Sequence, residues 1–429
     1  MKLFVKKYSY ILIYIISAII LGTILMILVY MLPVGRIRKN IQESIVVYKN
    51  ERASHDKPTI TPGLEIGKFD DFTDSIILRE CMYKDENSII YNAMMNNRWV
   101  FDDIDGQVES LIASADDDLL KNAKAQNYAR YWNGYLLYMK PLLVIFNVSE
   151  IRVLNMMLQV LLLCIAIIGI YKKLGAKIAI AFGGIVAFLN PVALSASFQF
   201  YDIYYILLIE TVVIMFYDDY LDKNDRWDKL LLITGILIAF FDFLTYPIVS
   251  FGIIIIFYML LHQKQSVKDS IIQSIRFIIL WGVGYVGMWI GKWVVAAILT
   301  GKNVVKDGID RVALHTVSNT QKIQAFDGLI RNIKAVLIKP FIIPVIILIL
   351  VFIVMIISKK ISFKPNLKFL LKTFIVIIIP FIWLIIMNRH AYNHCWMEYR
   401  EFSVTLFGLL CFVCSSITMS SVICKKPKS

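Results

Sequence analysis

The sequence predicts an all-α integral membrane protein with about ten transmembrane helices and a long, partly helical first loop. Hydrophobic residues make up 58% of the 429 residues and charged residues only 18%, whereas a soluble domain carries about 25% charged residues. Several apolar runs reach about 20 residues, the length that crosses the hydrocarbon core of a bilayer. Such a run spans as a helix, because in lipid its backbone must satisfy its own hydrogen bonds.

The first predicted span covers residues 8–33, directly after Lys6 and Lys7. It has the basic start of a signal peptide, but its apolar part is too long and no small-residue cleavage site follows it. We therefore assign residues 1–33 to a retained first transmembrane helix. Residues 34–150 are polar with recurring apolar positions, and they are long enough to form a small domain with interfacial helices.

Nine further apolar segments are predicted to span the membrane and to form a multi-helix domain over residues 151–424. They cover residues 151–171, 176–196, 201–217, 229–246, 247–262, 277–300, 338–358, 370–388 and 402–424. Lys and Arg gather in alternate connections, which predicts that both termini are cytoplasmic and that the first large loop is extracytoplasmic. The outer loop at 301–337 is an exception with six Lys and Arg, and residues 425–429 form a cytoplasmic tail.

The formal charge of +13 raises the question of a nucleic-acid partner. Because membrane orientation accounts for an excess of Lys and Arg, we predict no such partner. Frequent Ile and Lys are typical of an AT-rich bacterial genome, which favours the plasma membrane of a bacterial cell. The six cysteines form no metal-ligand or disulfide pattern, so they are interpreted as small apolar side chains.

The run "FDDFTD" at 69–74 places three carboxylates just before an apolar segment. The structural interpretation is helix capping, since Asp near a helix start accepts backbone N–H bonds and complements the helix dipole. The functional interpretation is a carboxylate base near the membrane surface. The candidate residues are Asp70, Asp71 and Asp74.

A second segment, "YARYWNGYLLYMK" at 128–140, combines early aromatic residues with two basic residues. Tyr and Trp favour the membrane interface, so one prediction is an interfacial helix that anchors the chain. The alternative is that Arg130, Tyr131 and Trp132 line a groove for the head group of a lipid-linked substrate.

Several ionisable residues are expected inside or beside the apolar segments, where an unpaired charge is costly. Asp242, in "AFFDFLTYP", lies close to the outer end of a span and is a functional candidate. Glu210 is deeper and is predicted to pair with Lys292 or to be protonated, whereas Asp202 is predicted to face solvent. In the loop after the seventh span, Arg311 is a candidate because a guanidinium can hold a phosphate through two hydrogen bonds.

The stretch "NRHAYNHCWMEYR" at 388–400 gathers polar chemistry between two apolar segments. Four interpretations are open: a metal site, a phosphate clamp, a catalytic base or a membrane-surface anchor. Two histidines one helical turn apart, with Glu398 extending the same face, resemble a zinc site. A head-group or phosphate site is favoured, because the predicted topology places the stretch on the same face as the first acidic run. Its candidate residues are Arg389, His390, His394, Tyr399 and Arg400.

A single first helix, a long loop with acidic residues near its start and polar residues gathered on one face resemble the GT-C superfamily of integral-membrane glycosyltransferases. The blocks "FDDFTD", "RYWNGY", "FFDFLTYP" and "NRHAYNHCWMEYR" also look similar to blocks in uncharacterised multi-pass proteins of Gram-positive bacteria. The architectural resemblance covers most of the chain. The Asp-Glu pair of the mannosyltransferases in the first loop has its nearest match here in Asp70-Asp71.

The resemblance implies an inverting hexosyltransferase that moves a sugar from a polyprenyl-phosphate donor to a glycan or lipid acceptor of the cell envelope. A carboxylate must accept the proton of the acceptor hydroxyl, and Asp71 or Asp74 is expected in that role, with Asp70 as the third option. Cationic and polar side chains are expected to hold the leaving phosphate, while Asp242 orients a cation or sugar hydroxyls. These phosphate and head-group residues are Arg400, His390, His394, Arg389, Tyr399, Arg130, Trp132 and Arg311.

Two other functions compete with transfer. A transporter or flippase of a lipid-linked sugar would use the same polar groups for binding, without a base. A non-enzymatic envelope scaffold would tolerate single replacements of these polar residues. No metal ligand is assigned, and the requirement for a divalent cation is left open, as is the identity of the sugar.

Overall fold

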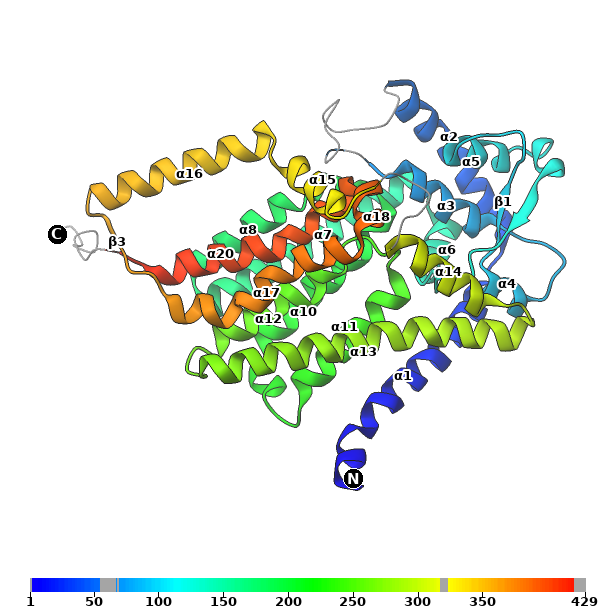
Figure 1. Ribbon diagram of the computed structural model, residues 1–429. Coiled ribbons are helices and arrows are strands. Elements are labelled where there is room, and N and C mark those ends of the chain that lie inside the picture. Colours follow the sequence, from blue (N-terminus) through cyan, green and yellow to red (C-terminus); the bar gives the residue numbers. More distant parts are fainter. Residues whose placement is uncertain (1, 55–66, 68, 317–322, 420–429) are drawn as a thin grey trace.

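The computed structural model describes residues 2–54, 67, 69–316 and 323–419, so the tail at 425–429 lies outside the described residues. Helices dominate this part of the chain (Figure 1). They are α1 (Lys2–Val29), α2 (Val34–Ser54), α3 (Asp71–Met82), α4 (Ile89–Met95), α5 (Gln107–Ala115), α6 (Leu136–Ile145), α7 (Val148–Leu174), α8 (Ala176–Phe188), α9 (Pro191–Ala196), α10 (Tyr201–Leu221), α11 (Arg226–Phe241), α12 (Ile248–Leu261), α13 (Val267–Thr300), α14 (Val304–Thr316), α15 (Asp327–Val336), α16 (Lys339–Ile357), α17 (Leu367–Ile386), α18 (Asn388–Asn393), α19 (Cys395–Glu398) and α20 (Phe402–Ser416). Three short 3-10 helices are η2 (Leu119–Asn122), η3 (Phe198–Phe200) and η4 (Tyr399–Glu401).

Two antiparallel strand pairs complete the described secondary structure. Strand β1 (Arg98–Val100) pairs with β2 (Lys124–Gln126), and Trp99 lies opposite Ala125. Strand β3 (Ile361–Phe363) pairs with β4 (Ile417–Met419), which joins the chain before α17 to the end of α20. The all-α prediction is therefore confirmed, and these short strands only join neighbouring segments locally.

A bundle of apolar helices carries a small domain at one end. Helices α7, α8, α10–α13, α17 and α20 run side by side, and the small domain, which we define as α2–α6 with β1 and β2, packs on one end of them (Figure 1). One hydrophobic core runs through both parts, since buried residues of the small domain such as Leu78 and Leu111 belong to the same cluster as those of the bundle. The small domain and the bundle therefore fold around a shared core.

Six helices are long and apolar enough to cross a membrane, within the part of the chain that the structure describes. They cover Ser9–Val29, Val148–Leu174, Phe198–Leu221, Val267–Thr300, Lys339–Ile357 and Leu367–Ile386. The other predicted spans contain the shorter helices α8, α11, α12 and α20, of 13, 16, 14 and 15 residues. The prediction of a multi-helix membrane protein agrees with these lengths, whereas the number of ten spans and the sidedness of the termini stay predictions.

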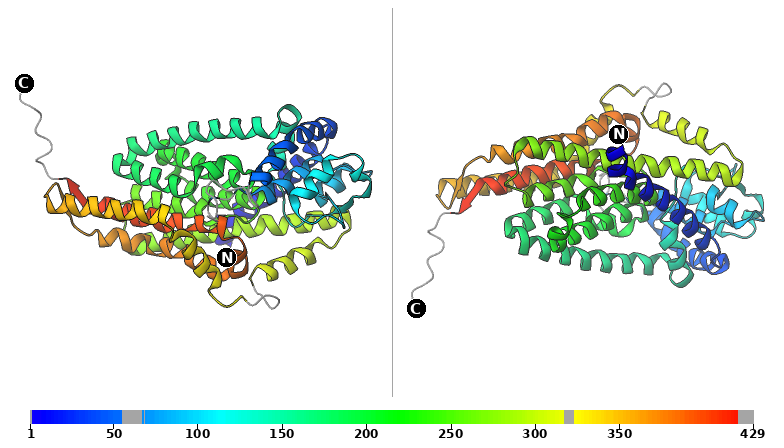
Figure 2. Two further views of the ribbon diagram at one scale, coloured as in Figure 1. Left: turned by 90° about the horizontal axis from the view of Figure 1, so that it is seen from above. Right: turned by 90° about the horizontal axis from the view of Figure 1, so that it is seen from below.

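Helix α16 lies along the outside of the bundle (Figures 1 and 2). None of its residues is buried, although all but three of them are Ile, Val, Leu, Phe or Met. Near its start, the Phe341 ring lies 5.0 Å from the Phe188 ring of α8, measured between centroids. A helix that is apolar all round and unburied suits a lipid environment.

Helices α11 and α13 approach each other most closely through glycine. A Cβ on Gly284 would lie 2.3 Å from the carbonyl oxygen of Leu232, and one on Gly235 would lie 2.0 Å from that of Trp281. Small residues at such crossings let two backbones pack directly, which is how helices associate in membranes.

Gly284→Ala is expected to lower the stability of the protein by about 1–3 kcal/mol, because the added methyl group collides with rigid backbone. Gly282→Ala, in the same helix, is the matched control, since no atom lies within 4 Å of a Cβ built there. Thermal unfolding of both variants in detergent micelles measures the effect. Equal melting temperatures for the two variants would show that the α11–α13 contact is looser than the structure has it.

Candidate functional site

Three segments that are distant in the sequence meet near the small domain: the start of α3, the corner after α11 and the stretch from α18 to η4 (Figure 1). The Trp396 indole of α19 approaches the Asp70 carboxyl group. His390 in α18 contacts the corner through the carbonyl oxygen of Leu244, at 2.8 Å. Asp242, His390, Glu398 and Glu401 are buried within reach of one another, and we name these four residues the acidic cluster. Asp70 is also buried and is joined to this stretch through Trp396.

Asp70 is the N-cap of α3 and is only 2% exposed. Its Oδ1 accepts a hydrogen bond from the Thr73 backbone N–H at 2.9 Å, and its own N–H donates to Ser197 Oγ at 2.9 Å. Burial raises the pKa of the Asp70 carboxyl group to about 6, against hydrogen bonds from Thr73 and Trp396 that lower it. A carboxylate with a pKa near neutrality is suited to general-base chemistry.

His390 and Glu398 form a buried pair, with His390 Nε2 3.1 Å from Glu398 Oε1. Burial lowers the pKa of His390 to about 4, so its imidazole is neutral, and the carbonyl oxygen of Leu244 holds the proton on Nε2. Burial raises the pKa of Glu398 well above its ordinary value, so this carboxyl group binds a proton more tightly than an exposed one. The Nε2–H of His390 is taken up by the Leu244 carbonyl oxygen, and its Nδ1 can only accept, so a protonated Glu398 is the member of the pair that can donate a hydrogen bond to a hydroxyl or phosphate oxygen.

Asp242 builds the corner between α11 and α12. Its Oδ2 accepts hydrogen bonds from the backbone N–H groups of Leu244 at 2.7 Å and Thr245 at 2.9 Å, and its Oδ1 accepts from the Thr245 hydroxyl. These bonds hold Leu244 at a φ of 72°, a conformation that is costly for a side chain of this kind. Strain of this sort persists only where the surroundings impose it, and here it points the Leu244 carbonyl at His390.

Glu401 closes the acidic cluster at the start of α12. Its Oε1 accepts the Ile248 backbone N–H at 3.2 Å, and the Val249 N–H also approaches it, so the positive end of the helix dipole faces this carboxyl group. Burial and the neighbouring Glu398 raise the pKa of Glu401. The Tyr285 phenol of α13 lies within electrostatic range of both glutamates, which places a further polar group beside the cluster.

His394 lies beside the pair, with its ring centroid 4.6 Å from that of His390. Burial and the neighbouring imidazole lower the pKa of His394, so it too is neutral. Among the residues that the structure describes, no three His, Cys, Asp or Glu side chains are placed to hold a metal ion. The zinc interpretation of His390, His394 and Glu398 therefore gains no support from the geometry.

Two of the three nitrogens of the Arg400 guanidinium donate to protein carbonyl groups, and the third, Nη2, is buried without a hydrogen-bond partner among the described residues. Its Nε donates to the Leu189 carbonyl oxygen at 2.9 Å and its Nη1 to that of Trp396 at 3.0 Å. It also lies 4.2 Å from the centroid of the Phe200 ring and is fully buried. The neighbouring Tyr399 is buried with its ring against Phe188, 5.6 Å away between centroids. Both residues therefore lie in the packed interior, where they join η4 to α8.

Arg400→Lys is expected to destabilise the protein by about 2 kcal/mol, because a lysine cannot keep two charge-assisted bonds to separate carbonyl groups. Thermal unfolding measures this loss, and Arg389→Lys, at a half-buried position of the same stretch, is the control. An unchanged melting temperature together with weaker binding of a polyprenyl phosphate would instead show that Arg400 holds the donor.

A second group of polar residues, around Arg130, is separated from the acidic cluster by the aromatic rings of Tyr131 and Phe243. Arg130 stacks on the Tyr128 ring, 4.4 Å from its centroid, and its Nη1 lies 3.5 Å from Asp307 Oδ2. Tyr131 is within electrostatic range of both Arg130 and Arg311, and its ring packs against Phe243, next to Asp242, with centroids 5.8 Å apart. The structure thus brings both arginines close to the corner after α11.

Other predicted site residues lie elsewhere. Trp132 is buried and its indole N–H donates to the Met288 carbonyl oxygen at 2.7 Å, so it anchors α13 and does not line an open groove. Asp74 is fully buried, and its Oδ1 accepts the Phe198 backbone N–H at 2.8 Å. Asp71 and Arg389 are half-buried, at the starts of α3 and α18.

The expected pairing of Glu210 with Lys292 and the expected solvent exposure of Asp202 were wrong. Lys292 does not pair with Glu210, because its Nζ donates to the Met94 carbonyl oxygen at 2.9 Å and to Asn96 Oδ1 at 2.8 Å. Glu210 accepts the Thr234 hydroxyl instead. Asp202 is buried, not solvent-exposed, and the Tyr138 hydroxyl lies near it.

Sequence reasoning missed Glu401 altogether and gave Trp396 only an anchoring role. An acidic residue directly before the last apolar segment was the available signal for Glu401, since a charge at the entrance to a span has a cost. Comparison with known proteins adds no relative, because no protein-family model, no curated protein and no solved structure matches the chain.

Proposed function

We propose that the protein is a membrane glycosyltransferase that moves a sugar from a polyprenyl-phosphate donor to a cell-envelope acceptor outside a bacterial plasma membrane. The observation that carries the proposal is the placement of Asp70, whose pKa is about 6, beside the stretch from α18 to η4 at the end of an apolar helix bundle. A base poised near neutral pH and neighbouring hydrogen-bond donors are what a sugar displacement requires.

In this proposal Asp70 accepts the proton of the acceptor hydroxyl as the oxygen attacks the anomeric carbon. The bond from that carbon to the donor phosphate breaks, and the phosphate leaves with the bonding electron pair. Glu398, whose pKa is raised by burial, donates a hydrogen bond to the substrate when it is protonated, while His390 accepts through Nδ1 because its Nε2–H is bonded to Leu244. Asp70 replaces Asp71 and Asp74 as the favoured base. Asp74 is less suitable because its Oδ1 already accepts a hydrogen bond from the Phe198 backbone N–H.

The developing charge on the leaving phosphate needs cationic donors. Arg130 and Arg311 are assigned to it because both approach Tyr131 beside the corner after α11. Two nitrogens of Arg400, in contrast, already donate hydrogen bonds to backbone carbonyl groups. The donor lipid reaches the site through the bilayer, so no nucleotide-binding fold is needed.

The test is transfer by the purified protein in liposomes. Radiolabelled polyprenyl-phosphate sugars are supplied with candidate cell-wall glycan and lipid acceptors, with and without a divalent cation. Labelled acceptor that depends on Asp70 is expected. Flipping of the labelled donor across the bilayer without any transfer would replace the enzyme by a transporter, and neither activity with any donor would favour a scaffold.

A further inference from the structure

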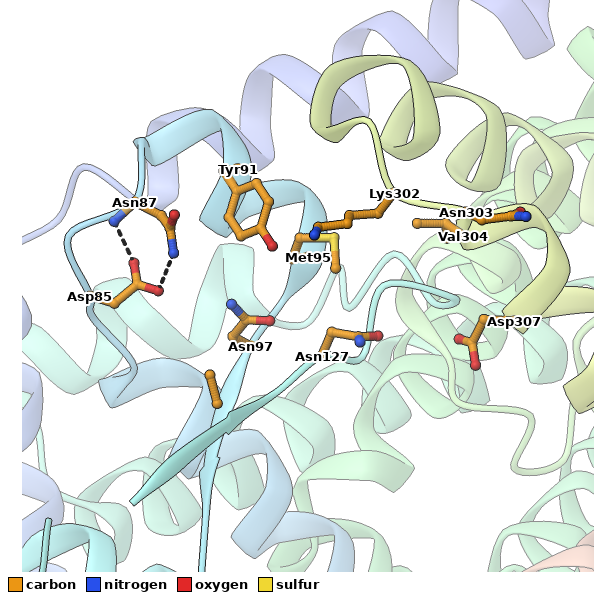
Figure 3. A pocket seen from close by; sticks show the side chains of 11 residues that line it. Asp85, Asn87, Tyr91, Met95, Asn97, Asn127, Lys302, Asn303, Val304 and Asp307 are labelled. Carbon is orange, nitrogen blue, oxygen red and sulfur yellow. Dashed lines mark hydrogen bonds between the residues drawn. The ribbon is translucent and has the colours of Figure 1, made fainter. Parts of the chain in front are cut away.

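A pocket of about 450 Å³ lies between the small domain and the connection from α13 to α14 (Figure 3). Its walls come from the chain around α4, from the residues around the end of β2 and from the start of α14. We name it the amide pocket, and its polar lining consists of Asp85, Asn87, Tyr91, Asn97, Asn127, Lys302, Asn303 and Asp307. Its volume is in the range of small-ligand sites, which is about 300–1,000 Å³.

Asp85 gives the pocket a fixed shape. Its carboxylate accepts hydrogen bonds from the Tyr83 hydroxyl at 2.7 Å, the Asn92 Nδ2 at 2.7 Å, and the backbone N–H and Nδ2 of Asn87 at 2.9 Å and 2.6 Å. Four donors saturate a carboxylate, so Asp85 orders the loop before α4 and is a poor ligand for a cation. A wall held in this way is formed before any ligand arrives, which lowers the entropic cost of binding.

The groups that point into the pocket both donate and accept hydrogen bonds. In Figure 3 the side chains of Tyr91, Asn97 and Asn127 point into the space between the small domain and the α13–α14 connection. Each amide has two donors and an acceptor, and a phenol does both, which matches ligand hydroxyl groups. Met95 and Val304 add apolar surface for the C–H face of a ring.

The charges in the lining offset each other. Asp307 lies 3.5 Å from Arg130 Nη1, and Lys302 is the cation on the facing wall. A phosphate or carboxylate ligand would require a cluster of guanidinium or ammonium groups at hydrogen-bond distance. With one lysine against two aspartates in the lining, a neutral ligand rich in hydroxyl groups is favoured.

We infer that the amide pocket binds a neutral saccharide, as a site separate from the acidic cluster. Its identification with a sugar unit of the acceptor glycan rests on the proposed function. Contacts from Asp307 to Arg130 and from Arg130 to Tyr131 join the wall of the pocket to the corner after α11, so the pocket adjoins the arginine that is assigned to the donor phosphate.

Binding to the full-length protein in lipid nanodiscs tests the inference, by saturation-transfer NMR and calorimetry. The probes are neutral hexoses, N-acetylhexosamines and their disaccharides, with hexuronic acids of the same ring size for comparison. Neutral probes are expected to bind, and Tyr91→Phe and Asn127→Ala are expected to raise their Kd about three- to tenfold, as loss of one hydrogen bond does. Asn122→Ala is the matched control, because Asn122 is an exposed asparagine of η2 outside the pocket lining.

Absence of binding by every neutral probe would overturn the inference, as would tighter binding of the hexuronic acids or unchanged binding by both pocket variants. Asp70→Asn separates this inference from the proposed function, since it should abolish transfer and leave saccharide binding intact. If the protein binds saccharides but transfers no sugar, the proposed function is wrong and the inference of a saccharide site still holds.

Discussion

Asp70→Asn is expected to reduce sugar transfer by about two to four orders of magnitude while the protein stays folded, because an amide cannot accept the proton of the acceptor hydroxyl. Asparagine caps helices as well as aspartate does, so the bond from the Thr73 N–H to the residue-70 side chain is retained. The variant therefore removes one carboxylate and little else. Transfer assays in liposomes at saturating donor measure the loss.

The stability of Asp70→Asn gives an internal check. Burial raises the pKa of Asp70 from 3.8 to about 6, so ionisation of the carboxyl group costs folding free energy as the pH rises between these two values. Asparagine does not ionise, so the melting temperature of the variant at pH 7 should be at least that of the native protein. A fall in melting temperature would show that the lost activity reflects unfolding.

The pH profile separates a base from a merely positioned residue. The base is active when ionised, so transfer by the native protein should rise with pH up to about 6 and level off above it. Any residual activity of Asp70→Asn should lack this rise. Asp71→Asn, the neighbouring half-buried acid, is the control and should keep both rate and profile. Full activity of Asp70→Asn would remove the assignment of Asp70 as base.

Hydropathy was enough to predict the helical architecture, because each of the ten predicted apolar segments contains a helix. It was not enough to count the spans. The segment at 176–196 breaks at Asn190, which takes a left-handed φ of 64° and caps α9, so it yields two short helices. Mean hydropathy does not reveal such a break, since the residues on both sides remain apolar.

The sequence also indicated the segments of the candidate site but not the task of each side chain. "FDDFTD" holds three carboxylates within one helical turn and a half, and only long-range contacts distinguish them. Asp70 meets Ser197 and Trp396, whereas Asp74 meets Arg152 and Phe198. Partners that are distant in the sequence determine these environments, and a single sequence does not show which distant residues come together.

Asp74→Ala is expected to destabilise the protein by about 3 kcal/mol, because it breaks a buried charge pair and leaves a buried N–H without an acceptor. Asp74 is fully buried, its Oδ2 lies 3.6 Å from Arg152 Nη2, and its Oδ1 accepts the Phe198 N–H. These contacts tie α3 of the small domain to α7 and η3 of the bundle. Chemical or thermal unfolding in detergent measures the loss.

Asp74→Asn should lose much less stability than Asp74→Ala, since an amide oxygen can still accept the Phe198 N–H and Glu51 still pairs with Arg152, with its Oε1 2.6 Å from Nη1. Asp118→Ala, which removes an exposed partner of Lys121, should leave the melting temperature unchanged. If Asp74 served as the base, Asp74→Asn would abolish transfer at normal stability. If Asp74 has a structural role, transfer activity should fall in both Asp74 variants only as far as the folded fraction falls. Asp70→Asn should instead lose transfer while it stays folded, and this difference would assign the two aspartates to different roles.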